Sequence, residues 1–138
     1  MVREEFGGVG GDMRASAVIY EETGRCGVAG LGGLGVHDIV AYYMQNQASD
    51  ELNQEWLPKA ANGEVLFAVA MTEPAAGSDL RGVKTRADRD GDDYIINGSK
   101  IFITNGIQAD AIAVVCRTDP EAERCGISII LVLSLIHI

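Results

Sequence analysis

The hydrophobic pattern of this chain changes its period once, near residues 61–64, and that change limits the folds it can adopt. Before it, apolar residues recur at the spacing of helices; after it, they form short runs bounded by Gly, Asp and Asn. Helices followed by strands predict an α+β arrangement of two layers or two domains. A chain of 138 residues has the length of one domain or of parts of two.

Three helices are predicted in the first half. A helix capped by Asp12 should run to about Glu22 and end at Gly24. A glycine-rich link leads to the second helix, and the third should begin after the cap Ser49 and end at Gly63. Apolar spacing predicts that these residues of the second and third helices face inward: Val36, Ile39, Val40, Tyr43 and Met44, then Leu52, Trp56, Leu57 and Ala60.

The second half predicts six strands, at residues 65–71, 83–87, 93–96, 100–104, 111–117 and 126–133. The first, VLFAVAM, is apolar throughout, which is typical of a strand buried on both faces. A turn at residues 89–92 should join the second strand to the third. Asn97-Gly98, a strong hairpin signal, should join the third to the fourth.

Composition excludes several classes of function. The chain has 11 basic and 20 acidic residues, a net charge of −9, which argues against binding nucleic acid or anionic membranes. No apolar stretch reaches the roughly 20 residues that span a bilayer, and we expect no signal peptide. Cys26, Cys116 and Cys125 lack CxxC spacing, so reduced thiols are expected. His37 and His137 are isolated, which predicts no metal site.

Two polar loops follow apolar strands and are the best candidates for chemistry. MTEPAAGSDL, residues 71–80, contains the hydroxyls of Thr72 and Ser78, and KIFITNG, residues 100–106, contains Thr104 and Asn105. Small polar loops after strands are often only turns. Two strand ends with hydroxyls and free amides could also bind the polar edge of a flat, anionic cofactor.

Taken together, these runs resemble the acyl-CoA dehydrogenase family. FAVAMTEPAAGSDL and GSKIFITNG are most similar to its long-chain branch, and REEFGGVGGD resembles the segment that leads into the middle of its N-terminal helical domain. The resemblance implies part of that helical domain at residues 1–63 and part of a middle domain, an incomplete antiparallel β-barrel, at residues 64–133. It also implies that the C-terminal helical domain is missing and that residues 134–138 are a non-family tail.

The resemblance implies FAD as the cofactor. Phe102 would pack on the flavin ring, and Thr104 would bond near flavin N5. Met71 and Thr72 would offer backbone N–H groups, and Gly77 would let the backbone come close. As alternatives, Phe102 would be a core aromatic and the two threonines would cap strand ends. The resemblance predicts as FAD-binding residues Val69, Met71, Thr72, Gly77, Ser78, Phe102, Ile103 and Thr104, with Ser78 also close to substrate.

The implied reaction is the α,β-dehydrogenation of a fatty acyl-CoA, in fatty acid β-oxidation. The family's base is a glutamate of the C-terminal domain that no residue here matches, so we expect these 138 residues to be inactive alone. Implied partners are an electron-transferring flavoprotein and further copies of the chain, in the bacterial cytoplasm or the mitochondrial matrix. The alternatives are a flavin- or acyl-binding fragment without catalysis, and a relative of the acyl-CoA oxidase or nitroalkane oxidase type.

Four residues near these motifs are expected to have structural roles. Glu73, Pro74 and Asp79 should shape the loop at residues 71–80, because Asp bonds backbone N–H groups and Pro restricts φ. His37 should be packed or partly exposed rather than a base. By resemblance, residues 36–40 would line a pocket for a fatty chain.

Overall fold

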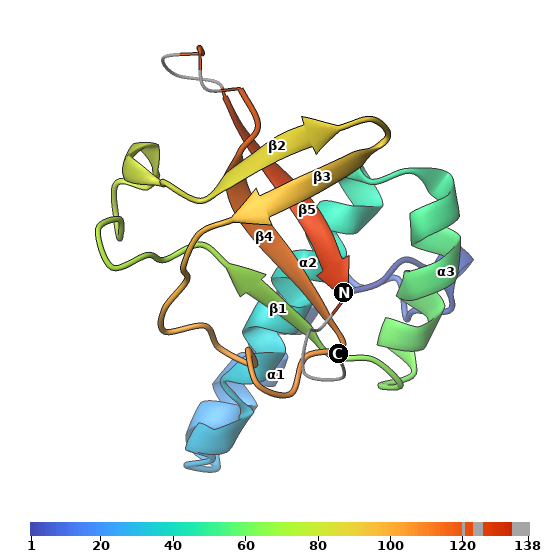
Figure 1. Cartoon of the computed structure of the whole chain (residues 1–138). Helices are drawn as coiled ribbons and strands as arrows, with labels where there is room; N and C mark the ends of the chain where they lie inside the picture. Colours follow the sequence, from blue (N-terminus) through green and yellow to red (C-terminus); the bar gives the residue numbers. More distant parts are fainter. Residues whose placement is uncertain (120, 123–125, 134–138) are drawn as a thin grey trace.

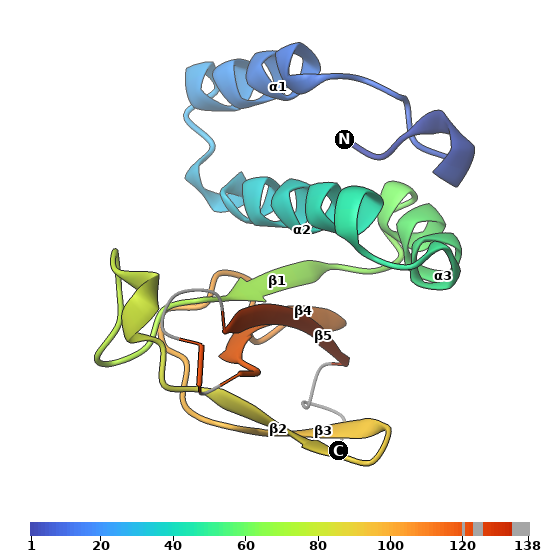
Figure 2. The same cartoon turned by 90° about the horizontal axis from the view of Figure 1, so that it is seen from above.

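The computed structural model describes residues 1–119, 121–122 and 126–133, and its elements lie in layers. Figure 2 shows α1 outermost, then α2 with α3, then β1, β4 and β5, and finally the β2–β3 hairpin. Figure 1 labels the elements α1 (Met13–Arg25), α2 (Gly33–Gln47), α3 (Asp50–Ala61), β1 (Phe67–Ala70), β2 (Arg86–Asp90), β3 (Asp93–Asn97), β4 (Ala111–Arg117) and β5 (Ile127–Leu133). Short 3-10 helices lie at Glu4–Phe6, Ala29–Leu31 and Leu80–Gly82.

The predicted helix caps are confirmed. The Asp12 carboxylate accepts a hydrogen bond of 2.9 Å from the backbone N–H of Arg14, and the Ser49 hydroxyl accepts one of 3.4 Å from Leu52. These bonds satisfy N–H groups that a helix start leaves free. α1 extends to Arg25, past the predicted end, because the left-handed residue that follows it is Gly27 (φ 67°) and not Gly24.

The inward faces of α2 and α3 are partly different from the prediction. α2 buries Val40, Ala41, Met44 and Gln45, and α3 buries Asn53, Leu57 and Ala60. Ile39, Tyr43 and Leu52 are 47%, 44% and 38% exposed, so their predicted burial is wrong. α2 packs against β1 and α3. Only the residues that face these two elements are buried, so the buried stripe of α2 is narrower than its apolar pattern suggests.

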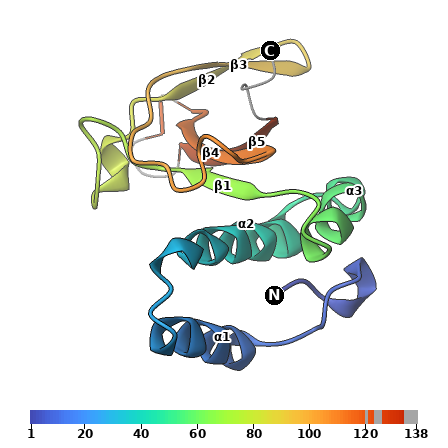
Figure 3. The same ribbon diagram turned by 90° about the horizontal axis from the view of Figure 1, so that it is seen from below.

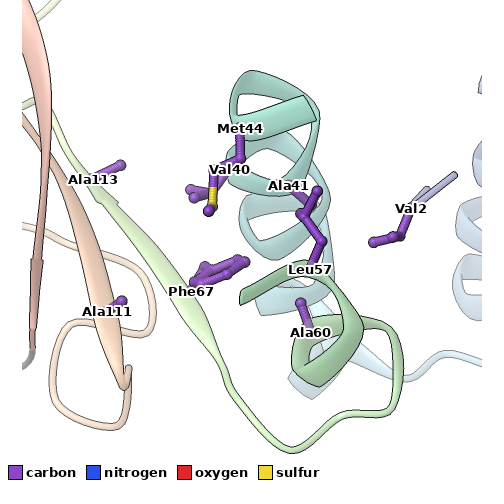
Figure 4. Packing of buried hydrophobic residues seen from close by; sticks show 9 residues of the cluster. All are labelled: Val2, Val40, Ala41, Met44, Leu57, Ala60, Phe67, Ala111 and Ala113. Atoms are coloured by element: carbon purple, nitrogen blue, oxygen red, sulfur yellow. The ribbon is translucent and has the colours of Figure 1, made fainter. Parts of the chain in front are cut away.

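Phe67 is at the centre of the main core (Figure 4). Its side chain is fully buried, the His37 ring stacks on it at 5.2 Å, and the Trp56 ring lies 6.3 Å away. Burying one such aromatic side chain contributes about 2–3 kcal/mol. The same cluster contains Val2 from the N-terminal segment and, from the helices and the sheet, Val40, Ala41, Met44, Leu57, Ala60, Ala111 and Ala113. This cluster holds β1 rigidly against α2 and α3.

The strands form one open, mixed sheet in the order β1-β4-β2-β3, with β5 also paired to β4. The predicted order of helices and then an incomplete sheet is confirmed, but two pairings are parallel: β1 with β4, and β2 with β4 at the single pair Arg86↔Arg117. β2–β3 and β4–β5 are antiparallel as expected. The parallel pair arises because the chain leaves β1, makes the β2–β3 hairpin in another layer, and returns beside β1.

The predicted strand at residues 100–104 is wrong, and Asn97-Gly98 makes no hairpin. Phe102 and Asn105 have φ values of 56° and 64°, in the left-handed region that no strand uses. Gly98 is needed for a different reason, since a Cβ there would lie 2.2 Å from the Thr85 hydroxyl oxygen. The turn at Gly91 is confirmed, with φ 63° between β2 and β3, although β2 begins at Arg86 and not at residue 83.

Some predictions fall on residues that the structure does not describe. These are Cys125, His137 and the tail at residues 134–138. Within the described residues, no helix is long and apolar enough to cross a bilayer.

Candidate cofactor site

Two loops, defined as loop A (residues 71–80, after β1) and loop B (residues 98–108, after β3), meet just past the end of β1, and loop B then runs along the free edge of β1 (Figure 3). The N–H of Ile101 donates a hydrogen bond of 3.0 Å to the Thr72 carbonyl, and Lys100 Nζ donates one of 3.0 Å to the Met71 carbonyl. The structure therefore brings together the two runs that the sequence selected, although about 30 residues separate them.

The free edge of β1, which faces away from β4, presents backbone groups to α2 and to loop B. The Phe67 N–H donates to His37 Nδ1 at 3.2 Å, and the Phe67 carbonyl accepts from Asn105 Nδ2 at 3.1 Å. Peptide groups alternate along a strand, so those of Val69 and Met71 point the same way, away from β4. The N–H groups of Met71 and Thr72 donate to no described residue, which leaves them available to a ligand.

Phe102 lies on the surface of loop B. Its side chain is 89% exposed and its backbone is left-handed, a conformation that is rare and costly for a bulky residue. The alternative that Phe102 is a core aromatic is therefore wrong. The backbone N–H groups of Phe102, Ile103 and Thr104 donate to no described residue, and the Thr104 side chain is exposed.

Asn105 fixes the shape of loop B and is a residue whose role the sequence reasoning missed. Its Nδ2 donates to the carbonyls of Gly33 in α2 and Phe67 in β1, at 3.0 and 3.1 Å, and its own carbonyl accepts from Gln108 and Ala109. The signal was present in the sequence, because Asn followed by Gly commonly marks a left-handed residue. Its partners could not be found without the tertiary structure.

Glu73 is a buried acidic residue of loop A whose carboxylate accepts four hydrogen bonds. Its Oε1 accepts from the Thr85 N–H at 2.9 Å, from the Thr85 hydroxyl and from Lys100 Nζ at 2.9 Å, and its Oε2 accepts from the Lys84 N–H at 2.7 Å. Burial by itself raises the pKa of the carboxyl, but these four hydrogen bonds outweigh burial and lower the pKa to about 2. Glu73 is thus an ionised structural group, in agreement with the loop-shaping role expected of it.

Gly77, Ser78 and Asp79 are exposed residues of loop A. A Cβ added to Gly77 would meet no atom within 4 Å, and the Ser78 side chain is open to solvent. No described hydrogen bond joins either residue to loop B. Asp79 accepts from the Arg81 N–H at 3.1 Å and pairs with its side chain at 2.9 Å, which lowers the pKa of Asp79 and caps the short helix Leu80–Gly82. Asp79 therefore shapes the loop, as expected.

His37 has a packing role between α2 and the free edge of β1. Its Nδ1 accepts a hydrogen bond from the Phe67 N–H, and its ring stacks on the Phe67 ring. His37 and Asp38 also line a cavity of about 260 Å³ with apolar residues of α1, α2 and the N-terminal segment, among them Ile19 and Leu34. Residues 36–40 are predicted to line a pocket, and His37 and Asp38 of this segment line this cavity.

The donor set suits the rim of a flavin. A flavin ring is flat and carries acceptor atoms along one edge, which a protein binds with N–H and O–H donors. The two loops offer the N–H groups of Met71, Thr72, Phe102, Ile103 and Thr104, each without a described acceptor, together with the exposed Thr104 hydroxyl and Phe102 ring. Among the described residues, no three His, Cys, Asp or Glu side chains cluster as metal ligands would.

Two family models together match most of the chain. The family model "Acyl-CoA dehydrogenase, N-terminal domain" matches residues 1–64, and "Acyl-CoA dehydrogenase, middle domain" matches residues 68–135. The chain is 44% identical over 133 residues to the mitochondrial long-chain specific acyl-CoA dehydrogenase of Sus scrofa, an alignment that covers 95% of this chain and 31% of that protein. The chain thus spans about a third of that relative's length.

Two solved structures are similar to this chain. The acyl-CoA dehydrogenase of Geobacillus kaustophilus matches with a TM-score of 0.88 and 49% identity, covering 96% of this chain and 35% of that chain. A glutaryl-CoA dehydrogenase of Mycobacterium smegmatis, solved in complex with FADH2, matches with a TM-score of 0.62 and 40% identity, covering 68% of this chain and 23% of that chain.

Proposed function

This chain belongs to the acyl-CoA dehydrogenase family, and we propose that it binds FAD through loops A and B for the α,β-dehydrogenation of a fatty acyl-CoA. Phe102 is the observation that carries the proposal. A side chain that is 89% exposed on a left-handed backbone gains nothing from the fold of the described residues. A flat ligand packed on this ring would account for both the exposed side chain and the left-handed backbone of Phe102.

The proposed roles of the loop residues follow from their positions. Phe102 would cover one face of the flavin ring and exclude water from it. Met71 and Thr72 in loop A, with Ile103 and Thr104 in loop B, would donate hydrogen bonds to acceptors at its rim. When bound, FAD would supply the acceptor for the hydride that leaves the β-carbon of the acyl thioester.

Ser78, Gly77 and Val69 complete the proposed set. The exposed Ser78 hydroxyl would reach the pyrophosphate of FAD or the thioester of the substrate. Gly77 would let a ligand approach the backbone, where no atom blocks it. Val69 would contribute peptide groups from the β1 edge.

No residue of loops A and B is suited to remove the α-proton. Glu73 has a pKa of about 2 and four hydrogen bonds to its carboxylate, so it is a weak base without a free approach. Asp79 is paired with Arg81. We therefore propose that these loops bind and orient the cofactor and that proton abstraction depends on a residue outside them.

The remaining sequence predictions stay proposals. They are the domain division at residues 1–63 and 64–133, an electron-transferring flavoprotein as the electron acceptor, assembly into a homo-oligomer, and a bacterial cytoplasmic or mitochondrial matrix location. A flavin-binding role without catalysis and an oxidase-type reaction are the competing functions.

The proposal is tested by mixing the purified 138-residue chain with FAD, desalting, and recording the visible spectrum. We expect retained flavin absorbance and its loss in Phe102→Ala. Ile107→Ala is the matched control, because Ile107 is also in loop B and is 87% exposed. A colourless wild-type chain, or equal loss of flavin in both variants, would contradict the proposed site.

A further inference from the structure

A buried ion pair joins the two loops of the proposed site. Lys100 Nζ lies 2.9 Å from Glu73 Oε1, and the side chains are 11% and 5% exposed. The same ammonium group donates to the Met71 carbonyl at 3.0 Å. Lys100 is therefore bonded twice to loop A, while its own backbone leads directly into Ile101 and Phe102 of loop B.

The pair connects three separate segments. Glu73 belongs to loop A, the Thr85 and Lys84 N–H donors precede β2, and Lys100 follows β3. All the strong contacts of the carboxylate come from outside its own loop. Glu73 thus fixes loop A relative to the start of β2 and to loop B at one point.

Stability alone gives little reason to bury such a pair. Removing two charges from water is costly, and apolar residues of similar volume often stabilise a fold equally well or better. A Lys–Glu pair adds direction, because its hydrogen bonds hold the joined segments in one geometry. The place where this geometry matters is next to the pair, where the Met71 and Thr72 carbonyls accept hydrogen bonds from Lys100 and Ile101 of loop B.

We infer that Glu73 and Lys100 are positioning residues whose ion pair holds loops A and B in the relative placement that binds the flavin rim. The inference rests on the proposed flavin function. The pair touches no ligand itself, and it acts through Met71, Thr72 and the residues after Ile101. When the ion pair is broken, loops A and B can separate. FAD binding must then include the free-energy cost of ordering them.

Lys100→Met is the variant to test, because it removes the ion pair while Glu73 keeps its hydrogen bonds from Thr85 and Lys84. Lys84→Met is the matched control, since it removes the same charge from an exposed side chain and keeps the backbone N–H that Glu73 uses. The FAD dissociation constant is measured by fluorescence quenching. Hydrogen exchange is measured without flavin on loops A and B, with α2 as the internal reference.

We expect Lys100→Met to weaken FAD binding by about tenfold or more, because ordering the loops then opposes binding, and Lys84→Met to change it by less than about twofold. Exchange should become faster in both loops and stay unchanged in α2. The double variant Glu73→Gln/Lys100→Met should bind FAD within about twofold of Lys100→Met, because the two residues act as one unit.

Each outcome decides a separate claim. Unchanged FAD affinity in Lys100→Met overturns the inference, and so does faster exchange in α2 as well as in the loops, which would mean a general loss of stability. A wild-type chain that binds no FAD overturns the proposed function and the flavin role of the pair. In that case the exchange data still decide whether the pair holds the loops together.

Discussion

Asn105 in loop B donates a 3.0 Å hydrogen bond to the carbonyl of Gly33, which lies 72 residues earlier at the start of α2. The same amide nitrogen donates to Phe67 in β1. One side chain thus ties loop B both to the helical layer and to the sheet. This link explains why loop B stays against the free edge of β1 without being a strand.

Gly33→Ala should destabilise the chain. A Cβ at residue 33 would lie 2.3 Å from Asn105 Oδ1, and Asn105 cannot move without losing its two hydrogen bonds. We expect a loss of about 1–3 kcal/mol in the free energy of unfolding, which exceeds the gain in helix propensity. Gly35→Ala, in the same helix, is the control, because its Cβ would make only an ordinary contact of 3.8 Å with Tyr20. Urea denaturation of both variants measures the difference, and equal stability would refute the clash.

Phe102→Gly should separate stability from ligand binding. Glycine adopts the left-handed backbone without strain, and the exposed ring contributes little to the core. We expect the free energy of unfolding to change by less than about 1 kcal/mol, while flavin retention is lost. Phe67→Ala should instead cost about 3–5 kcal/mol, because that ring is fully buried. Flavin retention by the folded Phe102→Gly chain would remove Phe102 from the site.

Gly77→Ala tests whether a ligand approaches loop A closely. The added methyl group meets no atom within 4 Å, so the melting temperature should not fall. If FAD contacts this backbone, its dissociation constant should rise by about tenfold, because the methyl group occupies the space of the ligand. Gly30→Ala is the control, with an equally open Cβ position between α1 and α2. Identical FAD affinities for both variants would place the ligand away from Gly77.

Glu73 should make the stability of the chain depend on pH in the acidic range. Its pKa is lowered from 4.5 to about 2 on folding, so its contribution is complete above pH 4.5 and is lost as pH falls toward 2. We expect the advantage of the wild type over Glu73→Gln to shrink by about 3 kcal/mol across this window. Urea denaturation of both chains from neutral pH downward measures it. If the difference in the free energy of unfolding between the two chains stays constant with pH, these hydrogen bonds do not lower the pKa of Glu73.

Part of the site could be predicted from the sequence because it is encoded by neighbouring residues. The polar runs of loops A and B stand out locally, and the structure places them together. The partners of Glu73 could not be predicted, since Thr85 and Lys100 are 12 and 27 residues away. Phe102 shows the same limit: an aromatic residue among apolar neighbours indicates a core position, and only the left-handed backbone places it outside.

The sequence by itself determined the caps at Asp12 and Ser49, the turn at Gly91 and the order of helices before strands. These features depend on interactions within a few residues, where side-chain chemistry and backbone preference are enough. Only the tertiary structure decided that β1 pairs in parallel with β4 and that Asn97-Gly98 makes no hairpin. Both depend on contacts between segments far apart in the chain. β1 and β4 pair within the main core, whereas hydrogen bonds from Lys100, Ile101 and Asn105 to β1 and loop A hold loop B in a shape that no hairpin allows, and these contacts outweigh the local turn preference.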